Sequence, residues 1–120
     1  MNIAEQFNNS LLFEFYGNLL TEKQKSILND FLNNNLSLTE IAESYGVTRQ
    51  AINDLIKRTI KILQSYEDKL GLLAKFKNIK SKVEKASLCI DSGDNQKVKE
   101  YLNDILEDYW WAYLKDYQLD

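Results

Sequence analysis

The chain has 120 residues, 44% of them hydrophobic and 12% aromatic, which is enough for one domain with a real core or one domain with an appendage. Proline is absent and only four residues are glycine, a composition that favours an all-α fold because little interrupts a helix. The net charge is −3. Cys89 is the only cysteine, which excludes an intrachain disulfide and a cysteine zinc cluster. The chain has no histidine, which argues against an enzyme, a metal site or a cofactor.

The first residues carry no targeting signal. Residues 1–9 contain Glu5 and neither lysine nor arginine, so they lack the basic start of a signal peptide. No apolar run approaches the roughly 18 residues of a membrane-spanning helix. The sequence therefore predicts a cytoplasmic protein without membrane insertion.

Two helices are predicted before residue 33. The first runs from about Ile3 to Tyr16 and should end at Gly17. Its residues at helical spacing form an apolar stripe of Ile3, Phe7, Leu11, Leu12 and Phe15. The second opens with a capping box of Thr21 and Gln24. It carries an apolar face of Ile27, Leu28, Phe31 and Leu32.

A third, short helix is predicted for about Leu38–Tyr45. Ser37 and Glu40 form the capping box that opens it, and Gly46 follows it directly, at a position where glycine adopts a positive φ without strain. The small side chain of Ala42 allows a second helix to cross closely. This combination predicts a helix-turn-helix, and the alternative is an ordinary helical hairpin with a glycine turn.

The fourth helix is the predicted recognition helix. It starts at Arg49, with Thr48 as its N-cap, and meets no stop signal before Gly71, so it should be a rod of about 30 Å. One face is apolar, comprising Ile52, Leu55, Ile56, Thr59, Ile60 and Leu63. The candidate nucleic-acid contacts are Thr48, Arg49, Gln50, Asn53, Lys57 and Arg58, together with Lys23 and Lys25.

Residues 71–120 are predicted to form a C-terminal helical hairpin, set apart from a helix-turn-helix domain of residues 1–70. Apolar residues alternate by four and three, the spacing of a heptad seam, in two successive runs. The first run is Leu72, Phe76, Ile79, Val83, Ala86 and Ile90. The second is Val98, Leu102, Ile105, Tyr109 and Ala112.

Aromatic residues near the C-terminus exceed what one helical stripe can bury. Adjacent residues of a helix point about 100° apart, so Trp110 and Trp111 cannot share a stripe. A dimer or partner interface is one interpretation, and packing of the hairpin on the first and fourth helices is the other. The candidate interface residues are Tyr101, Tyr109, Trp110, Trp111 and Tyr113.

The charge is unevenly distributed along the chain. Residues 49–85 hold ten basic and four acidic residues, a net +6, whereas residues 1–48 carry −4 and residues 86–120 carry −5. Such asymmetry can form one positive surface or complementary faces within a dimer.

The sequence resembles the YlxM-like family of small bacterial helix-turn-helix proteins. The residues that carry the resemblance are 19–25 (LLTEKQK), 36–43 (LSLTEIAE), 47–52 (VTRQAI), 56–59 (IKRT) and 66–72 (YEDKLGL). Residues 20–63 are also similar to region 4 of bacterial sigma factors, from which they depart by the acidic Asp54. The resemblance implies an all-α protein encoded beside the signal recognition particle GTPase and its receptor, with a regulatory role in that pathway.

Three functions follow as hypotheses. In the first, a homodimer binds duplex DNA with two recognition helices about 34 Å apart. In the second, the protein binds the RNA or the GTPase of the signal recognition particle, and RNA contacts come from Lys75, Lys77, Lys80, Lys82 and Lys85. In the third, the helix-turn-helix contacts protein only, which Asp54 and the acidic net charge favour.

Overall fold

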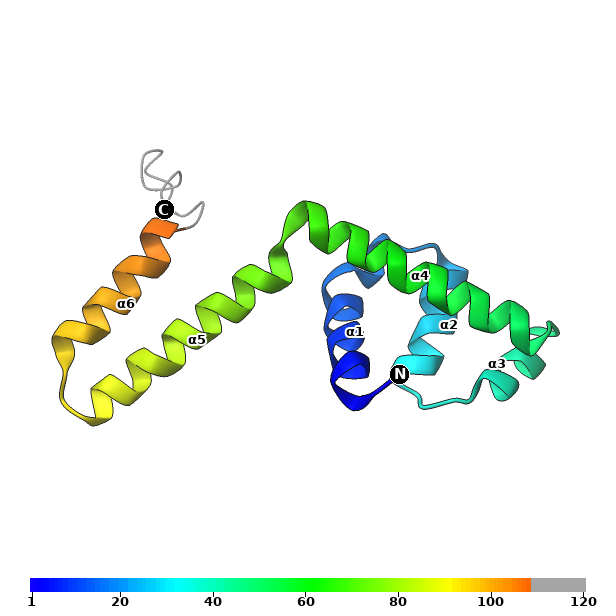
Figure 1. Ribbon diagram of the computed structural model, residues 1–120, viewed down its shortest axis with the longest axis horizontal. Coiled ribbons are helices and arrows are strands. Elements are labelled where there is room, and N and C mark those ends of the chain that lie inside the picture. The colour runs from blue at the N-terminus through cyan, green and yellow to red at the C-terminus, as the bar shows by residue number, and fades with distance from the viewer. Residues whose placement is uncertain (109–120) are drawn as a thin grey trace. The chain divides into compact units, whose positions relative to one another are not determined.

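The structure is a computed structural model that describes residues 1–108. In these residues every regular element is helical, so the all-α prediction is confirmed (Figure 1). The elements are α1 Ile3–Tyr16, the 3₁₀ helix η1 Gly17–Leu19, α2 Glu22–Leu32, α3 Leu38–Tyr45, α4 Arg49–Leu70, α5 Leu72–Asp91 and α6 Asn95–Asp108. The chain divides into two compact units, Met1–Leu73 and Ala74–Asp120, with the boundary in the first turn of α5.

The helix ends follow the predicted capping residues. In the box before α2, the Gln24 amide donates to Thr21 Oγ1 at 3.2 Å and the Thr21 amide donates to Gln24 Oε1 at 3.1 Å. Ser37 and Glu40 make the same reciprocal pair before α3. Gly71, which ends α4, has φ +62°, the left-handed conformation that glycine adopts without Cβ strain.

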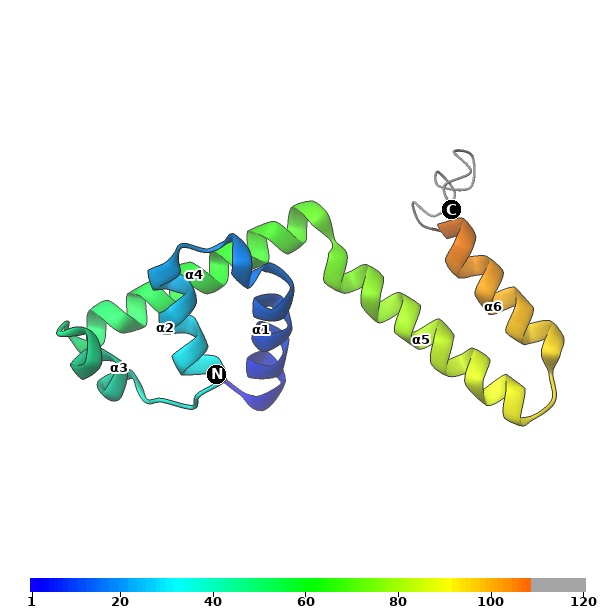
Figure 2. The same ribbon diagram turned by 180° about the vertical axis from the view of Figure 1, so that it is seen from behind.

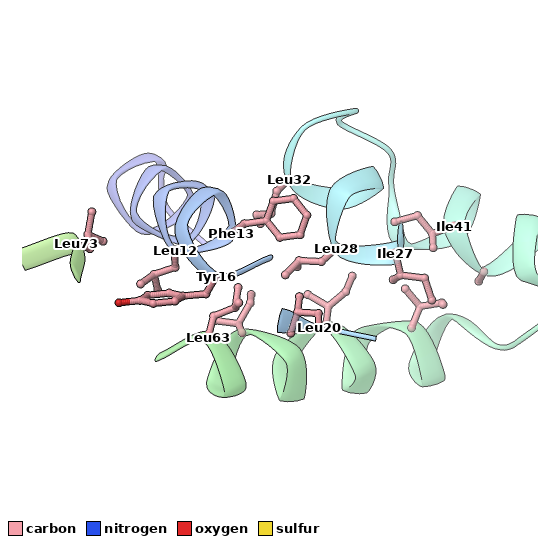
Figure 3. Packing of buried hydrophobic residues seen from close by; sticks show 14 residues of the cluster. Leu12, Phe13, Tyr16, Leu20, Ile27, Leu28, Leu32, Ile41, Leu63 and Leu73 are labelled. Atoms are coloured by element: carbon pink, nitrogen blue, oxygen red, sulfur yellow. The ribbon is translucent and has the colours of Figure 1, made fainter. Parts of the chain in front are cut away.

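The core of the first unit lies between α4 and the three helices before it. α4 packs against α1, α2 and α3, which Figure 2 shows from behind. Ile27, Leu28, Ile41 and Leu63 are buried together, as Figure 3 shows. Each such side chain contributes about 1.5–3 kcal/mol when it leaves water, so this cluster holds the helix-turn-helix in place.

The apolar stripe of α1 is only partly covered: Ile3 and Phe7 are exposed, whereas Leu11 and Phe15 pack against the core. α1 buries a neighbouring face that includes Asn9, Leu12, Phe13 and Tyr16. The polar Asn9 is accommodated because its Nδ2 donates to the Met1 sulfur at 3.4 Å.

A buried tyrosine joins α1 to the junction of α4 and α5. The Tyr16 hydroxyl donates to Glu67 Oε1 at 2.5 Å and accepts from the Leu72 amide at 3.2 Å. Glu67 Oε1 also accepts from the Leu73 amide at 2.9 Å. These bonds cap the start of α5, whose first amides have no partner within the helix. Burial, and then the bond to Glu67, raises the pKa of Tyr16 above its ordinary value of 10.0.

The second unit is the predicted antiparallel hairpin. α5 and α6 lie side by side in both ribbon views (Figures 1 and 2). Lys82 Nζ of α5 forms an ion pair with Asp108 Oδ2 of α6 at 2.6 Å. Of the predicted interface residues, Tyr101 is half-buried. Tyr109, Trp110, Trp111 and Tyr113 lie outside the described residues.

Candidate nucleic-acid interface

The turn between α3 and α4 has the geometry of a helix-turn-helix. Gly46 adopts φ +67°, and the Val47 amide donates to the Ala42 carbonyl at 3.0 Å. Ala42 is buried, as its small size predicted. Thr48 then caps α4 by accepting the Ala51 amide on Oγ1 at 3.1 Å. The Thr48 hydroxyl is therefore engaged in holding the N-terminus of α4.

The solvent side of the first turns of α4 forms what we call the reading face. It is defined by six exposed residues: Arg49, Gln50, Asp54, Lys57, Arg58 and Lys61. Four of them are basic and one is acidic, so the reading face carries a net charge of +3. The buried residues Ile52 and Ile56 occupy the opposite side of the same turns and orient the face outward.

Asp54 lies in the middle of the reading face and engages its neighbours. Gln50 Nε2 donates to Asp54 Oδ1 at 2.9 Å, and Arg58 Nε donates to the Asp54 carbonyl at 3.4 Å. The sequence predicted Gln50 and Arg58 as contacts but not that Asp54 holds both. The i, i+4 spacing of Gln50 and Asp54 is the signal that could have revealed their side-chain pairing. Arg58 bonds to the backbone carbonyl of Asp54, which any residue at that position would supply.

A cleft of about 500 Å³ lies beside the reading face. Asn53, Lys57 and Lys61 from α4 contribute to one wall, and residues of α1, α2 and α3 contribute to the rest. Asn53 is half-buried, so it lies at the edge of the reading face rather than on it. Lys61, absent from the predicted contacts, follows Lys57 by one turn.

The two predicted lysines of α2 differ in their surroundings. Lys23 is exposed. Lys25 is half-buried, and its Nζ donates to Asn18 Oδ1 of η1 at 2.6 Å. Lys25 also lines a small depression with Phe13 of α1. Lys23 thus remains a candidate phosphate contact, whereas Lys25 is oriented toward η1 and α1.

The five lysines predicted as an RNA-binding strip do not share one face of α5. Lys82 points to Asp108 of α6, and Lys80 lies about 160° away around the helix. Lys80 is within 3.2 Å of Glu84 one turn on. Lys77 and Lys85 are exposed, whereas Lys75 is half-buried. The positive charge of α5 is therefore spread around the helix.

Within residues 1–108, the structure shows neither a membrane-spanning helix nor a metal-binding cluster. No helix in this range combines the length and apolar character that crossing a bilayer requires. The same residues contain no cluster of histidine, cysteine or carboxylate side chains arranged to hold a metal ion.

Comparison with known proteins relates nearly the whole described chain to one group. Residues 3–108 match the family UPF0122, described as "Putative helix-turn-helix protein, YlxM / p13 like". A UPF0122 protein of Clostridium kluyveri is 44% identical over 103 residues, which cover 86% of this chain and 93% of that protein. One from Desulforamulus reducens is 45% identical, with 82% and 90% covered, and one from Bacillus thuringiensis is 44% identical, with 80% and 86% covered.

Proposed function

The chain belongs to the UPF0122 family of YlxM/p13-like helix-turn-helix proteins, and from this premise we propose that it is a cytoplasmic regulatory protein that binds duplex DNA. The observation that carries the proposal is the reading face: an N-capped helix whose first turns are exposed and carry a net charge of +3. Such a helix has the size and charge to enter the major groove.

The residues of the reading face divide into two roles. Arg49 and Gln50 stand at the exposed start of α4, where a guanidinium suits guanine and an amide suits adenine. Lys57, Arg58 and Lys61 supply cations for phosphates, whose neutralisation provides most of the affinity. Two copies acting together would place two recognition helices about 34 Å apart on successive turns of the duplex.

A second candidate function follows from Asp54 and the family resemblance. A carboxylate in the middle of the reading face disfavours phosphate, and the whole chain carries a charge of −3. Both features suit a module that contacts protein. In this alternative the chain acts in the signal recognition particle pathway, by binding the particle's GTPase or its RNA, and the helix-turn-helix is not used for DNA.

The test is a binding titration with a matched control. The full chain and a variant with Arg49, Gln50 and Lys57 changed to alanine are titrated against fluorescent duplex DNA at several salt concentrations. The control changes Lys80, Lys85 and Asn78 to alanine, which also removes two cations and one amide from exposed positions. Helical content is compared in all three proteins.

We expect DNA affinity to fall in the first variant only. Its salt dependence should decrease by about one phosphate contact per chain, that of Lys57, because Arg49 and Gln50 contact bases. Equal losses in both variants would mean that the positive charge acts without a defined face and would contradict the proposal. A parallel titration with signal recognition particle RNA and GTPase tests the alternative. Binding there, unchanged in the first variant and without affinity for DNA, would favour it.

A further inference from the structure

The hairpin of α5 and α6 presents an apolar row that follows a heptad. Phe76, Val83 and Ile90 recur every seven residues along α5, an interval that keeps them within about 20° per step on one line of the helix. Val83 is 49% exposed and Ile90 is 59% exposed. The heptad pattern predicted a seam along α5, and α6 does not cover this half of it.

α6 contributes a second exposed row on the same face. Val98 and Ile105 are half-buried, whereas Leu102 is 47% and Leu106 is 57% exposed. The less exposed residues mark the side of each helix that faces the other: Ile79, Lys82 and Ala86 on α5, and Val98, Tyr101 and Ile105 on α6. In each helix the exposed row lies about 80° around the helix axis from these residues. Because the two helices are antiparallel and the rotation has the same sense in both, the two rows lie on one side of the hairpin. We call Val83, Ile90, Leu102 and Leu106 the hairpin face.

The hairpin does not bury a core by itself. Among described residues 74–108, Ala86 is the one apolar side chain that is buried. Lys82 lies about 100° around α5 from Val83, and Asp108 lies about 160° around α6 from Leu106, so their ion pair adds nothing to the covering of the hairpin face. Two helices need a further apolar layer to be stable in water, and the hairpin face is the surface that such a layer would cover.

We propose that the hairpin face packs on the same face of a second copy of this chain, forming an antiparallel four-helix bundle. Heptad spacing is the pattern of helix packed on helix, which indicates a helical occupant. Charge then favours a second copy. α5 holds five lysines against two acids, a net +3, and α6 holds two lysines against four acids, a net −2.

A two-fold axis parallel to the helices lays each α5 beside the partner's α6, so a basic helix meets an acidic one on both sides of the bundle. The Lys82–Asp108 pair makes the same match within one copy. The role of the dimer, which would hold two helix-turn-helix units together on DNA, rests on the proposed function. The assembly itself can be tested without nucleic acid.

The experiment measures the mass of the full chain by sedimentation equilibrium across the micromolar range. Val83→Glu places a charge in the hairpin face, and Leu88→Glu places the same charge on α5 about 140° away, at a position that is 69% exposed. The wild-type chain and Leu88→Glu should be dimers. Val83→Glu should weaken dimerisation by at least about 30-fold, because its carboxylates would be buried without partners.

A second measurement covers the case in which Val83→Glu fails to fold. In a Cys89→Ser background, chains with Val83→Cys and chains with Leu106→Cys are mixed and oxidised. Disulfides between the two kinds of chain are expected to dominate over those within one kind, because α5 faces the partner's α6. Disulfides mainly between Val83→Cys chains would overturn the proposed pairing.

Three further results would test the proposed dimer and separate it from the proposed function. A wild-type chain that stays monomeric would mean that its own residues or another protein cover the hairpin face, and the proposal would be wrong. A dimer equally sensitive to both glutamates would place the interface elsewhere. A stable dimer without DNA affinity would support this inference while contradicting the proposed function, and a DNA-binding monomer would do the reverse.

Discussion

Replacing Asp54 with asparagine should strengthen DNA binding if the reading face meets the duplex. Asparagine keeps an acceptor oxygen for Gln50, whose Nε2 lies 2.9 Å from Asp54 Oδ1, so the change removes the charge and preserves the local bond. Asp54 lies in the interior of α4, away from its capped start, and asparagine has a similar helix propensity. The variant therefore isolates one electrostatic contribution.

The size of the effect follows from Coulomb's law. A carboxylate about 7 Å from a phosphate is repelled by about 0.6 kcal/mol in bulk water and by about 2 kcal/mol at an effective dielectric constant of about 20. Salt screens charges over about 10 Å at moderate ionic strength, which reduces these values by about half. The remaining repulsion of about 0.3–1 kcal/mol means that affinity should rise by roughly 2- to 5-fold, and the gain should shrink as salt increases.

The assay is fluorescence anisotropy with a labelled duplex at two salt concentrations. The control is Asp68→Asn, which removes the same charge from an exposed position of the same helix. Asp68 is 14 residues from Asp54, a distance of about 21 Å and well beyond the screening length, so its loss should change affinity little. Unchanged or weaker binding by Asp54→Asn, or equal gains in both variants, would refute the placement of the reading face against DNA.

Three further predictions concern the fold. Tyr16→Phe should lower the free energy of unfolding by about 2 kcal/mol in urea titrations, because the bond to Glu67 is lost. Because the pKa of Tyr16 is raised, wild-type stability should fall as pH rises above 10.0, where only the unfolded chain ionises this group. That contribution should vanish in Tyr16→Phe and persist in Tyr45→Phe. Gly46→Ala should lower the thermal midpoint, costing about 1 kcal/mol at φ +67°, and an unchanged midpoint would contradict the strain argument. Ala42→Leu should destabilise by about 1–3 kcal/mol in the same melt, whereas Ala51→Leu at an exposed position should not.

The helix boundaries were predictable because the signals that set them are local. Thr21, Ser37 and Thr48 each bond to an amide three residues ahead, a relation that the sequence contains in full. Gly46 and Gly71 likewise end helices through their own backbone conformations. The positions of α3 and α4, and hence of the reading face, followed from these residues.

What the sequence could not reveal depends on which faces meet. α1 carries two apolar stripes, and only packing shows that Tyr16 rather than Phe7 is buried. The bond of Tyr16 to Glu67 joins residues 51 positions apart, so no local pattern contains it. The heptad of α5 identified the apolar row. A periodic pattern describes one surface of a contact, however, and does not identify the partner that packs on it.

The junction at Tyr16 has a consequence for the order in which the protein folds. The first amides of α5 are satisfied by a side chain from α1 and by one from the end of α4. Starting a helix is the costly step of its formation, and here part of the starting turn is supplied from outside α5. The hairpin therefore gains a defined beginning only after the N-terminal helix has docked. During synthesis, the helices before α5 would be in place as α5 emerges, and Tyr16 and Glu67 would template its first turn.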